Sequence, residues 1–133
     1  MEEALRVFRA SCIASHPFLK PEFIQKAEQR MRERSLLEFE TDVLDDGGVR
    51  AFLCRTNSYI DALFVDPPYQ KRGLGKALLD HAKAKSTVIH LSVFAQNPRA
   101  LKFYQREEFW AVKLNEHHET GETVVQLKWE ARQ

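Results

Sequence analysis

The chain has 133 residues, a length that suits one domain with one hydrophobic core. Its 20 Lys plus Arg against 19 Asp plus Glu give a formal net charge of +1, which favours neither nucleic acid nor an anionic membrane as the main partner. No apolar run approaches the roughly 20 residues that cross a bilayer, and two scattered cysteines are too few for a disulfide framework or a zinc site, so we expect a single cytoplasmic domain over residues 1–133 without metal.

Two amphipathic helices are predicted at the N-terminus. The first runs from Glu2 to Ser15 and ends there, because Pro17 disfavours helix in the residue before it. The second begins near Pro21, since proline suits the first position of a helix. The apolar stripes of the two helices contain Ala4, Leu5, Phe8, Cys12, Ile13, Phe23, Ile24, Ala27 and Met31.

Three strands are predicted next. The stretch from Leu37 to Val43 alternates apolar and acidic residues, which is typical of a half-buried strand. The turn signal of residues 45–48 joins it to a second strand from Val49 to Arg55, so the two form a hairpin. A third, more apolar strand from Tyr59 to Val65 ends before two prolines, which cannot donate to a strand ladder. The residues expected on the buried face of the first strand are Leu37, Phe39, Thr41 and Val43.

The second half of the chain alternates helices and strands. A helix is predicted from the glycine turn to about Lys85, then a strand from Val88 to Phe94, which in this order indicates a parallel crossover. Asn97 and Pro98 start a further helix that runs to about Glu107. Two last strands follow at residues 110–115 and 123–130. The residues of the helix after the glycine turn that are expected to point inward are Leu74, Ala77, Leu78 and Ala82.

The turn from Gln70 to Gly75 carries the main functional signal. It lies between a strand and a helix, where several backbone N–H groups point to one place at the positive end of the helix dipole. Gly73 and Gly75 have no Cβ, so we expect positive φ there and a close approach of the backbone to an anion. The basic side chains around the turn are Lys71, Arg72 and Lys76. Together these features predict a pyrophosphate site.

Two other glycine-rich phosphate loops do not fit this turn. No glycine stands three residues after Gly75, so the dinucleotide fingerprint G-x-G-x-x-G is absent. The P-loop is excluded because Ala77 follows Gly75-Lys76, where G-x-x-x-x-G-K-[ST] needs Ser or Thr. Taken alone, the hexapeptide is equally compatible with a ligand-free connection that uses two turn glycines.

Two segments of the chain resemble the signatures of one family and occur in the same order as in that family. The spacing Q-x-x-G-x-G of Gln70, Gly73 and Gly75 resembles the acetyl-CoA signature of the GNAT superfamily of N-acetyltransferases. The segment NPRALKFYQREEF at 97–109 resembles the second cofactor segment, N-x-x-A-x-x-F-Y-x-x-x-G-F, with Asn97 and Tyr104 on one helical face. The resemblance covers residues 37–129 and implies an α/β fold: a twisted mixed sheet flanked by helices, of the type found in small single-domain bacterial members.

The resemblance also implies roles for individual residues. Asn97 hydrogen-bonds the pantetheine arm of the cofactor, and Tyr104 lies near the sulfur as the general acid for the leaving thiolate. A bulge in the strand at Leu63–Val65 offers backbone N–H groups to the pantetheine and the carbonyl, and Pro67 and Pro68 help to keep the two parallel strands apart. The implied acetyl-CoA-binding residues are Leu63, Phe64, Val65, Gln70, Lys71, Arg72, Gly73, Leu74, Gly75, Lys76, Asn97, Ala100, Phe103 and Tyr104.

The chain departs from the family pattern in three places. Members usually begin with a strand, whereas a helix comes first here, so the strand at residues 37–43 is expected to be exposed or paired with a second copy in a homodimer. Glu108 stands where the family has glycine, so that turn must differ or be strained. Ser92 stands where several members have a glutamate, which argues against a base from that strand.

The implied function is acetyl-CoA-dependent N-acetyl transfer to a primary amine by direct attack on the thioester. The acceptor is a small molecule or a protein amine, and the alternative is a non-catalytic acyl-CoA-binding or regulatory module of the same fold. Asp61 is the one carboxylate on the Tyr59–Val65 strand and is the first candidate for the base, with His16 and His90 as weaker ones. If the acceptor amine is already partly neutral when it binds, ordered water is sufficient as the proton acceptor.

Overall fold

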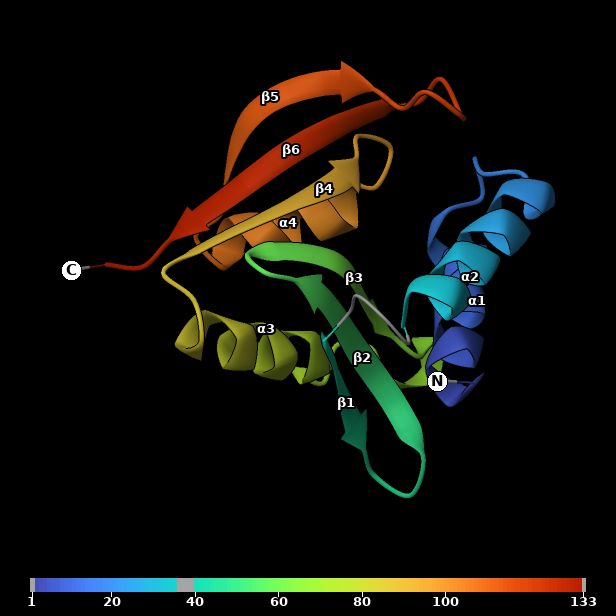
Figure 1. Cartoon of the computed structure of the whole chain (residues 1–133), viewed down its shortest axis with the longest axis horizontal. Helices are drawn as coiled ribbons and strands as arrows, with labels where there is room; N and C mark the ends of the chain where they lie inside the picture. The colour runs from blue at the N-terminus through green and yellow to red at the C-terminus, as the bar shows by residue number, and fades with distance from the viewer. Residues whose placement is uncertain (1, 36–39, 133) are drawn as a thin grey trace.

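The computed structural model describes residues 2–35 and 40–132 and contains four α-helices, six strands and one short 3-10 helix within those ranges (Figure 1). In chain order the elements are α1 (Glu2–Ser15), α2 (Pro21–Ser35), β1 (Glu40–Asp45), β2 (Val49–Thr56), β3 (Tyr59–Val65), η1 (Pro67–Tyr69), α3 (Leu74–Ala84), β4 (Val88–Phe94), α4 (Pro98–Arg106), β5 (Trp110–Glu116) and β6 (Thr123–Glu130). Every predicted helix and strand is confirmed. Residues 37–39 of the first predicted strand lie outside the described residues.

The strands form one mixed sheet with the order β1-β2-β3-β4-β6-β5. Neighbours are antiparallel except β3 and β4, which are parallel and joined through α3, as the strand–helix–strand order predicted. β1 and β5 are therefore the sheet edges, so the first strand lies at an edge as expected. A homodimer paired through that edge stays a prediction.

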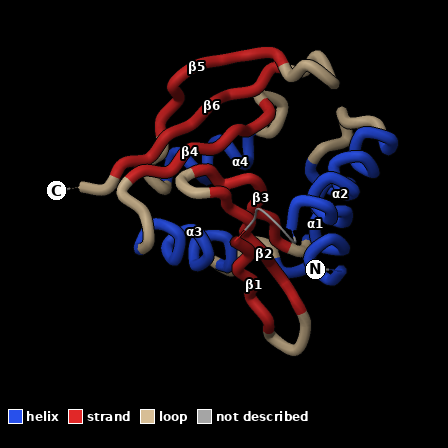
Figure 2. The backbone as a smooth tube through the Cα atoms, in the orientation of Figure 1, coloured by secondary structure: helices blue, strands red, loops and turns tan. Residues whose placement is uncertain are grey.

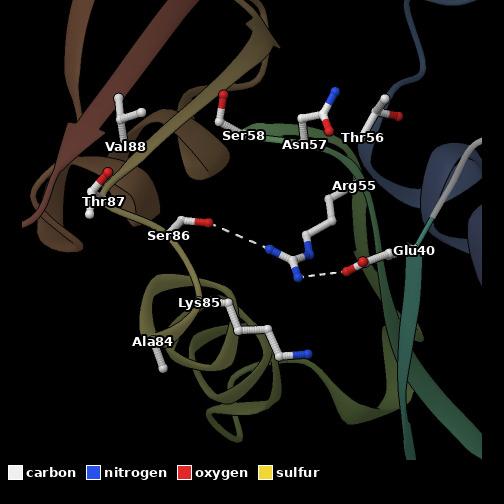
Figure 3. Close-up of a pocket in the computed structure, with 10 residues that line it drawn as sticks. All are labelled: Glu40, Arg55, Thr56, Asn57, Ser58, Ala84, Lys85, Ser86, Thr87 and Val88. Atoms are coloured by element: carbon white, nitrogen blue, oxygen red, sulfur yellow. Dashed lines mark hydrogen bonds and ion pairs between the residues drawn. The ribbon is translucent and has the colours of Figure 1, made fainter.

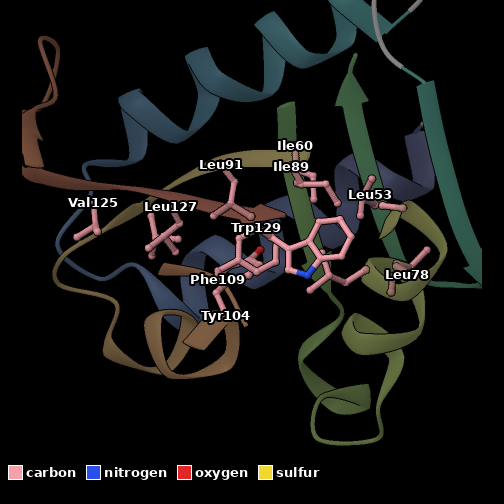
Figure 4. Close-up of a cluster of buried hydrophobic side chains, with 14 residues drawn as sticks. Leu53, Ile60, Leu78, Ile89, Leu91, Tyr104, Phe109, Val125, Leu127 and Trp129 are labelled. Atoms are coloured by element: carbon pink, nitrogen blue, oxygen red, sulfur yellow. The ribbon is translucent and has the colours of Figure 1, made fainter. Parts of the chain in front are cut away.

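Helices cover both faces of the sheet (Figures 1 and 2). Successive residues of β2 belong to different clusters, since side chains of a strand alternate between faces. Ala51 and Leu53 pack with residues of α3, β4 and β6, whereas Phe52 and Cys54 pack with residues of α1 and α2. The larger cluster is shown in Figure 4, where Tyr104 and Phe109 lie against Trp129. None of the described helices has the length and apolarity to cross a membrane.

The two parallel strands separate after a single pair. β3 and β4 are in register only at Tyr59 and His90, where the His90 N–H donates to the Ser58 carbonyl at 2.8 Å. Residues 63–65 pair regularly with 51–53 of β2, so the bulge expected there is wrong. The register shift instead leaves Asp61 without an opposite residue in β2. Because β4 has moved away, the N–H groups on that side of residues 63–65 have no strand partner and face the gap between the strands.

Four expectations about side-chain faces are wrong. Ile13 is 67 % exposed, because α1 buries the opposite side of the helix, with Leu5 and Cys12, against the sheet. Thr41 is exposed and Val43 is 47 % exposed, because the contacts of α1 with the sheet are mainly with β2 and β3. Its neighbour Leu44 faces α3 and packs against the core instead. In α3, Leu79 is fully buried, whereas Ala77 is exposed.

The strain expected at Glu108 is present. Glu108 has φ +71°, a left-handed conformation in which a side chain is unfavourable. The Phe109 N–H donates to the Tyr104 carbonyl at 2.9 Å and the Glu108 N–H to the Gln105 carbonyl at 3.1 Å. These two bonds form a Schellman motif, which usually has glycine at this position. The turn thus keeps the geometry of the family glycine although the residue is glutamate.

Replacing Glu108 with glycine is expected to raise the free energy of unfolding by about 0.5–1 kcal/mol. The change relieves about 1–2 kcal/mol of left-handed strain and costs about 0.5–1 kcal/mol of chain entropy. The ion pair of Glu108 with Arg132 is exposed and contributes little. Urea unfolding gives the measurement. The control Gln105→Gly, in an exposed helical position, should lower the same free energy by about 1 kcal/mol, and equal destabilisation by both would contradict the strain.

Candidate active site

The loop after β3 has a backbone suited to an anion. Lys71 and Gly73 both have positive φ, at +65° and +79°, with Arg72 between them. Such a conformation directs successive N–H groups into one concavity. Gly75 does not have the positive φ expected for it, because it is the second residue of α3 and is helical. A left-handed lysine was not expected, since lysine rarely adopts this conformation.

The first turn of α3 supplies free donors. The first intrahelical bond is made by the Ala77 N–H to the Gly73 carbonyl at 3.0 Å. The preceding N–H groups, of residues 74–76, therefore have no acceptor within the helix, as at any helix start. They lie at the positive end of the dipole of an 11-residue helix, where an anion is stabilised.

Two side chains brace this loop. The Gln70 Nε2 donates to the Val65 carbonyl at 3.2 Å and so ties the loop to the end of β3. The Arg72 guanidinium lies 5.2 Å from the centre of the Tyr69 ring, and that of Arg50 lies 4.3 Å from it. The predicted cofactor residue Arg72 is thus held against an aromatic ring, a cation–π arrangement.

Asn97 and Tyr104 lie on one helix, α4. Asn97 is its N-cap, and its side-chain oxygen accepts the Ala100 N–H at 3.2 Å. Tyr104 is only 7 % exposed and packs edge-on against Phe103 and Phe109, with ring centres 5.0 and 5.4 Å apart. Burial raises the pKa of the Tyr104 hydroxyl, so it keeps its proton at neutral pH. Within the described ranges the hydroxyl bonds no other side chain, which leaves it available as a donor.

One cavity brings the two segments together. Its volume is about 710 Å³, within the range of small-molecule sites. Of the residues predicted to bind the cofactor, all except Arg72 line it: Leu63, Phe64, Val65, Gln70, Lys71, Gly73, Leu74, Gly75, Lys76, Asn97, Ala100, Phe103 and Tyr104. Two segments with residues 77–96 between them therefore share one space at the point where β3 and β4 separate.

Sequence reasoning missed a second group of residues that line this cavity. They are Ser11, Ser15, Tyr69, Arg99, Lys102, Arg106 and Glu107, and they line the cavity together with His16, which was predicted only as a weaker candidate for the base. A signal was present for the basic ones, because Arg99, Lys102 and Arg106 are spaced by three and four and so share one face of α4. No local signal marks the α1 residues, since only the packing of α1 beside β3 brings them here.

The charge of the cavity favours an anion. Its charged lining is Lys71, Lys76, Arg99, Lys102, Arg106 and Glu107, five basic residues and one acidic. The Glu107 carboxylate is already engaged, 3.1 Å from Lys76 Nζ and 3.7 Å from Lys83 Nζ. A concave site with this excess of positive charge attracts a polyphosphate.

The candidates for a base lie outside the cavity lining, apart from His16. The Asp61 carboxylate accepts the Thr56 hydroxyl at 2.7 Å and lies 3.7 Å from Arg34 Nη1. His90 is exposed on β4. On β4, the neighbour of β3, Ser92 bonds the Tyr59 hydroxyl at 2.7 Å and donates to Gln126 Oε1 at 2.7 Å, so it joins a polar row on the open face of the sheet.

Cysteine and metal chemistry find no support in the described part of the chain. Burial raises the pKa of Cys12 to about 12 and that of Cys54 to about 11, so neither is a thiolate at neutral pH. Both thiols are free and buried. No group of three or more His, Cys, Asp or Glu side chains among residues 2–35 and 40–132 is arranged to hold a metal ion.

A second, open cavity of about 860 Å³ lies between the β2–β3 turn and the α3–β4 connection (Figure 3). Its main cation, Arg55, already bonds Glu40 at 2.6 Å and Ser86 at 3.5 Å. None of the residues predicted for cofactor binding or catalysis lines it. The glycine-turn cavity is therefore the candidate site.

Known proteins resemble this chain over most of its length. The family model "Acetyltransferase (GNAT) domain" matches residues 14–131. Among curated proteins, the peptidyl-lysine N-acetyltransferase YjaB of Salmonella typhimurium is 29 % identical, with 90 % of this chain and 83 % of that protein covered. The peptidyl-lysine N-acetyltransferase YiaC of Escherichia coli is 27 % identical, with 94 % and 87 % covered.

A solved structure shares the whole architecture. The solution structure of the apo form of YjaB from Escherichia coli superposes with a TM-score of 0.81 at 26 % sequence identity. The match covers 96 % of this chain and 88 % of that one. The arrangement of helices and sheet therefore belongs to a shared fold.

Proposed function

The chain belongs to the GNAT acetyltransferase family and is an acetyl-CoA-dependent N-acetyltransferase, and we propose that its acceptor is the lysine amine of a protein or peptide. The observation that carries the site is the single cavity shared by the glycine turn and by α4. Both full-length relatives named above act on peptidyl-lysine, which supports this acceptor. The reading as a non-catalytic module has no comparable support.

The cavity fits the cofactor by its chemistry. The free N–H groups at the start of α3 and the left-handed Lys71 and Gly73 suit a pyrophosphate. The N–H groups of residues 63–65 that face away from β2 suit the amide carbonyls of a pantetheine arm that enters between β3 and β4. Asn97 lines the same cavity and offers side-chain N–H donors there. When bound, acetyl-CoA supplies an activated thioester.

We propose that groups of the chain stabilise or neutralise the charges that develop during acetyl transfer. A backbone N–H of residues 63–65 is suited to stabilise the oxygen of the carbonyl under attack, and such a donor is typically worth about 3 kcal/mol. The Tyr104 hydroxyl is proposed to give its proton to the departing sulfur, which its raised pKa keeps available. Asp61 is paired with Thr56 and Arg34, so we propose that it takes the proton of the amine only through water.

The acceptor assignment predicts a specific pH profile. With a peptide that contains one lysine and a blocked N-terminus, the release of free thiol is expected to rise about tenfold per pH unit between about pH 7 and 9. The reason is that the lysine amine, with an ordinary pKa of about 10.4, must be neutral to attack. Tyr104 does not limit the rate in this range, because burial raises its pKa above the ordinary value of 10.0.

The matched control is the same peptide with arginine in place of lysine, which should release no thiol. Spermidine and a peptide with a free N-terminus complete the panel. Preference for either over the lysyl peptide would contradict the proposed acceptor. Tight binding of acetyl-CoA without thiol release from any amine would favour the non-catalytic module instead.

A further inference from the structure

The turn between α1 and α2 brings one histidine into the cofactor cavity. His16 lines the cavity together with Asn97 although the two are 81 residues apart in sequence. Its backbone is held on both sides, since its N–H donates to the Cys12 carbonyl at 2.8 Å and its carbonyl accepts the Leu19 N–H at 3.0 Å. Its ring packs against Phe18 and Phe94, with centres 5.5 and 5.9 Å away. The side chain is therefore fixed in place.

The hydrogen bonds of Asn97 settle which atom of its amide faces His16. Only an oxygen can accept the Ala100 N–H, so Asn97 Oδ1 must face α4, as it does at 3.2 Å. Asn97 Nδ2 then faces His16 Nε2 at 3.3 Å. Since Nδ2 carries only donors, Nε2 of His16 must be the acceptor. The proton of the neutral ring is consequently on Nδ1.

This tautomer leaves a donor unpaired. His16 Nδ1 is buried and has no hydrogen-bond partner among the described residues. An unpaired buried donor is unfavourable, and native proteins rarely keep one without a reason. Burial also lowers the pKa of His16, which keeps the ring neutral and Nε2 able to accept. His16 therefore lacks a hydrogen bond at Nδ1 and keeps the one between Nε2 and Asn97.

We propose that His16 is a positioning residue of the acetyl-CoA site, which holds the Asn97 amide through Nε2 so that its second N–H is presented to the cavity. The inference rests on the proposed function for the cofactor that fills this cavity. Asn97 is then fixed at both ends of its amide, by Ala100 and by His16. With its Nδ1 protonated and its Nε2 occupied, His16 does not serve as the base for the acceptor amine.

The first test reads the tautomer directly. In the ligand-free protein, long-range ¹H–¹⁵N correlation spectra should show His16 neutral with the proton on Nδ1, the rarer tautomer of histidine. Asn97→Asp keeps an oxygen that caps α4 and replaces the donor Nδ2 with an acceptor oxygen, so His16 should then carry a proton on Nε2. A charged ring, or a proton on Nε2 in the unaltered chain, would overturn the proposal without reference to activity.

The second test measures the affinity for coenzyme A by calorimetry. His16→Phe keeps a ring of similar size beside Phe18 and Phe94 but has no acceptor, and it should weaken binding about tenfold. His16→Gln offers a carbonyl oxygen near the position of Nε2 and should restore most of the affinity. The control Phe18→Leu disturbs the same aromatic cluster without touching Asn97 and should stay within about twofold.

A double-mutant cycle separates positioning from packing. In the Asn97→Ser background, His16→Phe should have no further effect, because the partner that it positions is gone. Equal losses in both backgrounds would show that His16 acts only through packing and would overturn the proposal. If the unaltered chain bound no coenzyme A, the proposed function itself would fail, a result distinct from binding that is insensitive to His16.

Discussion

Replacing Tyr104 with phenylalanine is expected to lower kcat about 100-fold and to change the affinity for acetyl-CoA less than about threefold. The substitution removes the hydroxyl that we propose to protonate the leaving sulfur, and general acid catalysis typically contributes about 10²–10⁴-fold. We expect the lower end of this range of rate effects, because a thiolate is a better leaving group than an alkoxide and needs less help from an acid. The ring itself remains in the core beside Phe103 and Phe109, so folding should be preserved.

Steady-state kinetics with the lysyl peptide, together with calorimetry of acetyl-CoA, provide the measurement. Tyr59→Phe is the matched control, since it removes a tyrosine hydroxyl that bonds Ser92 on the open face of the sheet, outside the cavity lining. Its kcat should remain within about threefold. An unchanged kcat for Tyr104→Phe would remove Tyr104 from the acid role, and a parallel loss of affinity would indicate a contact rather than proton transfer.

Replacing Gly75 with valine is expected to weaken acetyl-CoA binding by about 100-fold. A Cβ at this position would lie 3.6 Å from Phe103 and 3.7 Å from Val65, both of which line the cavity. Alanine therefore fits in ordinary contact, whereas the two methyl groups of valine would enter the space that the ligand needs. A 100-fold loss of affinity corresponds to about 2.8 kcal/mol of binding free energy, and blocked access to the N–H groups contributes to it.

A substitution at Gly73 distinguishes the loss of space for the ligand from strain in the backbone. A Cβ at Gly73 would meet nothing within 4 Å, but its φ of +79° is unfavourable for any side chain. Gly73→Ala should therefore lower the free energy of unfolding by about 1–2 kcal/mol and weaken binding less than Gly75→Val. Gly75→Val should have the larger effect on binding in calorimetry and little effect on unfolding in urea. The opposite order would place the ligand elsewhere along the turn.

Much of the fold was predictable because local patterns are strong here. Three features each depend on only a few neighbouring residues and could be recognised in the sequence. They are the alternation in β6, the prolines after β3 and the Asn97-Pro98 start of α4. The faces of Ile13 and Val43 were not predictable, because apolarity alone does not say which side a neighbouring element will cover. The α1 helix contacts mainly β2 and β3 of the sheet, and that is a property of the packing.

The sequence by itself determined the two segments that are predicted to bind the cofactor, since glycine spacing, an N-cap and a helical interval of seven residues are local chemistry. Only the tertiary structure decided that these segments share one cavity, that Asp61 pairs with Arg34 instead of lining it, and that His16 reaches Asn97. The physical reason is distance along the chain. Contacts between residues tens of positions apart depend on how the sheet is ordered and where β3 and β4 separate, and no local pattern encodes that arrangement.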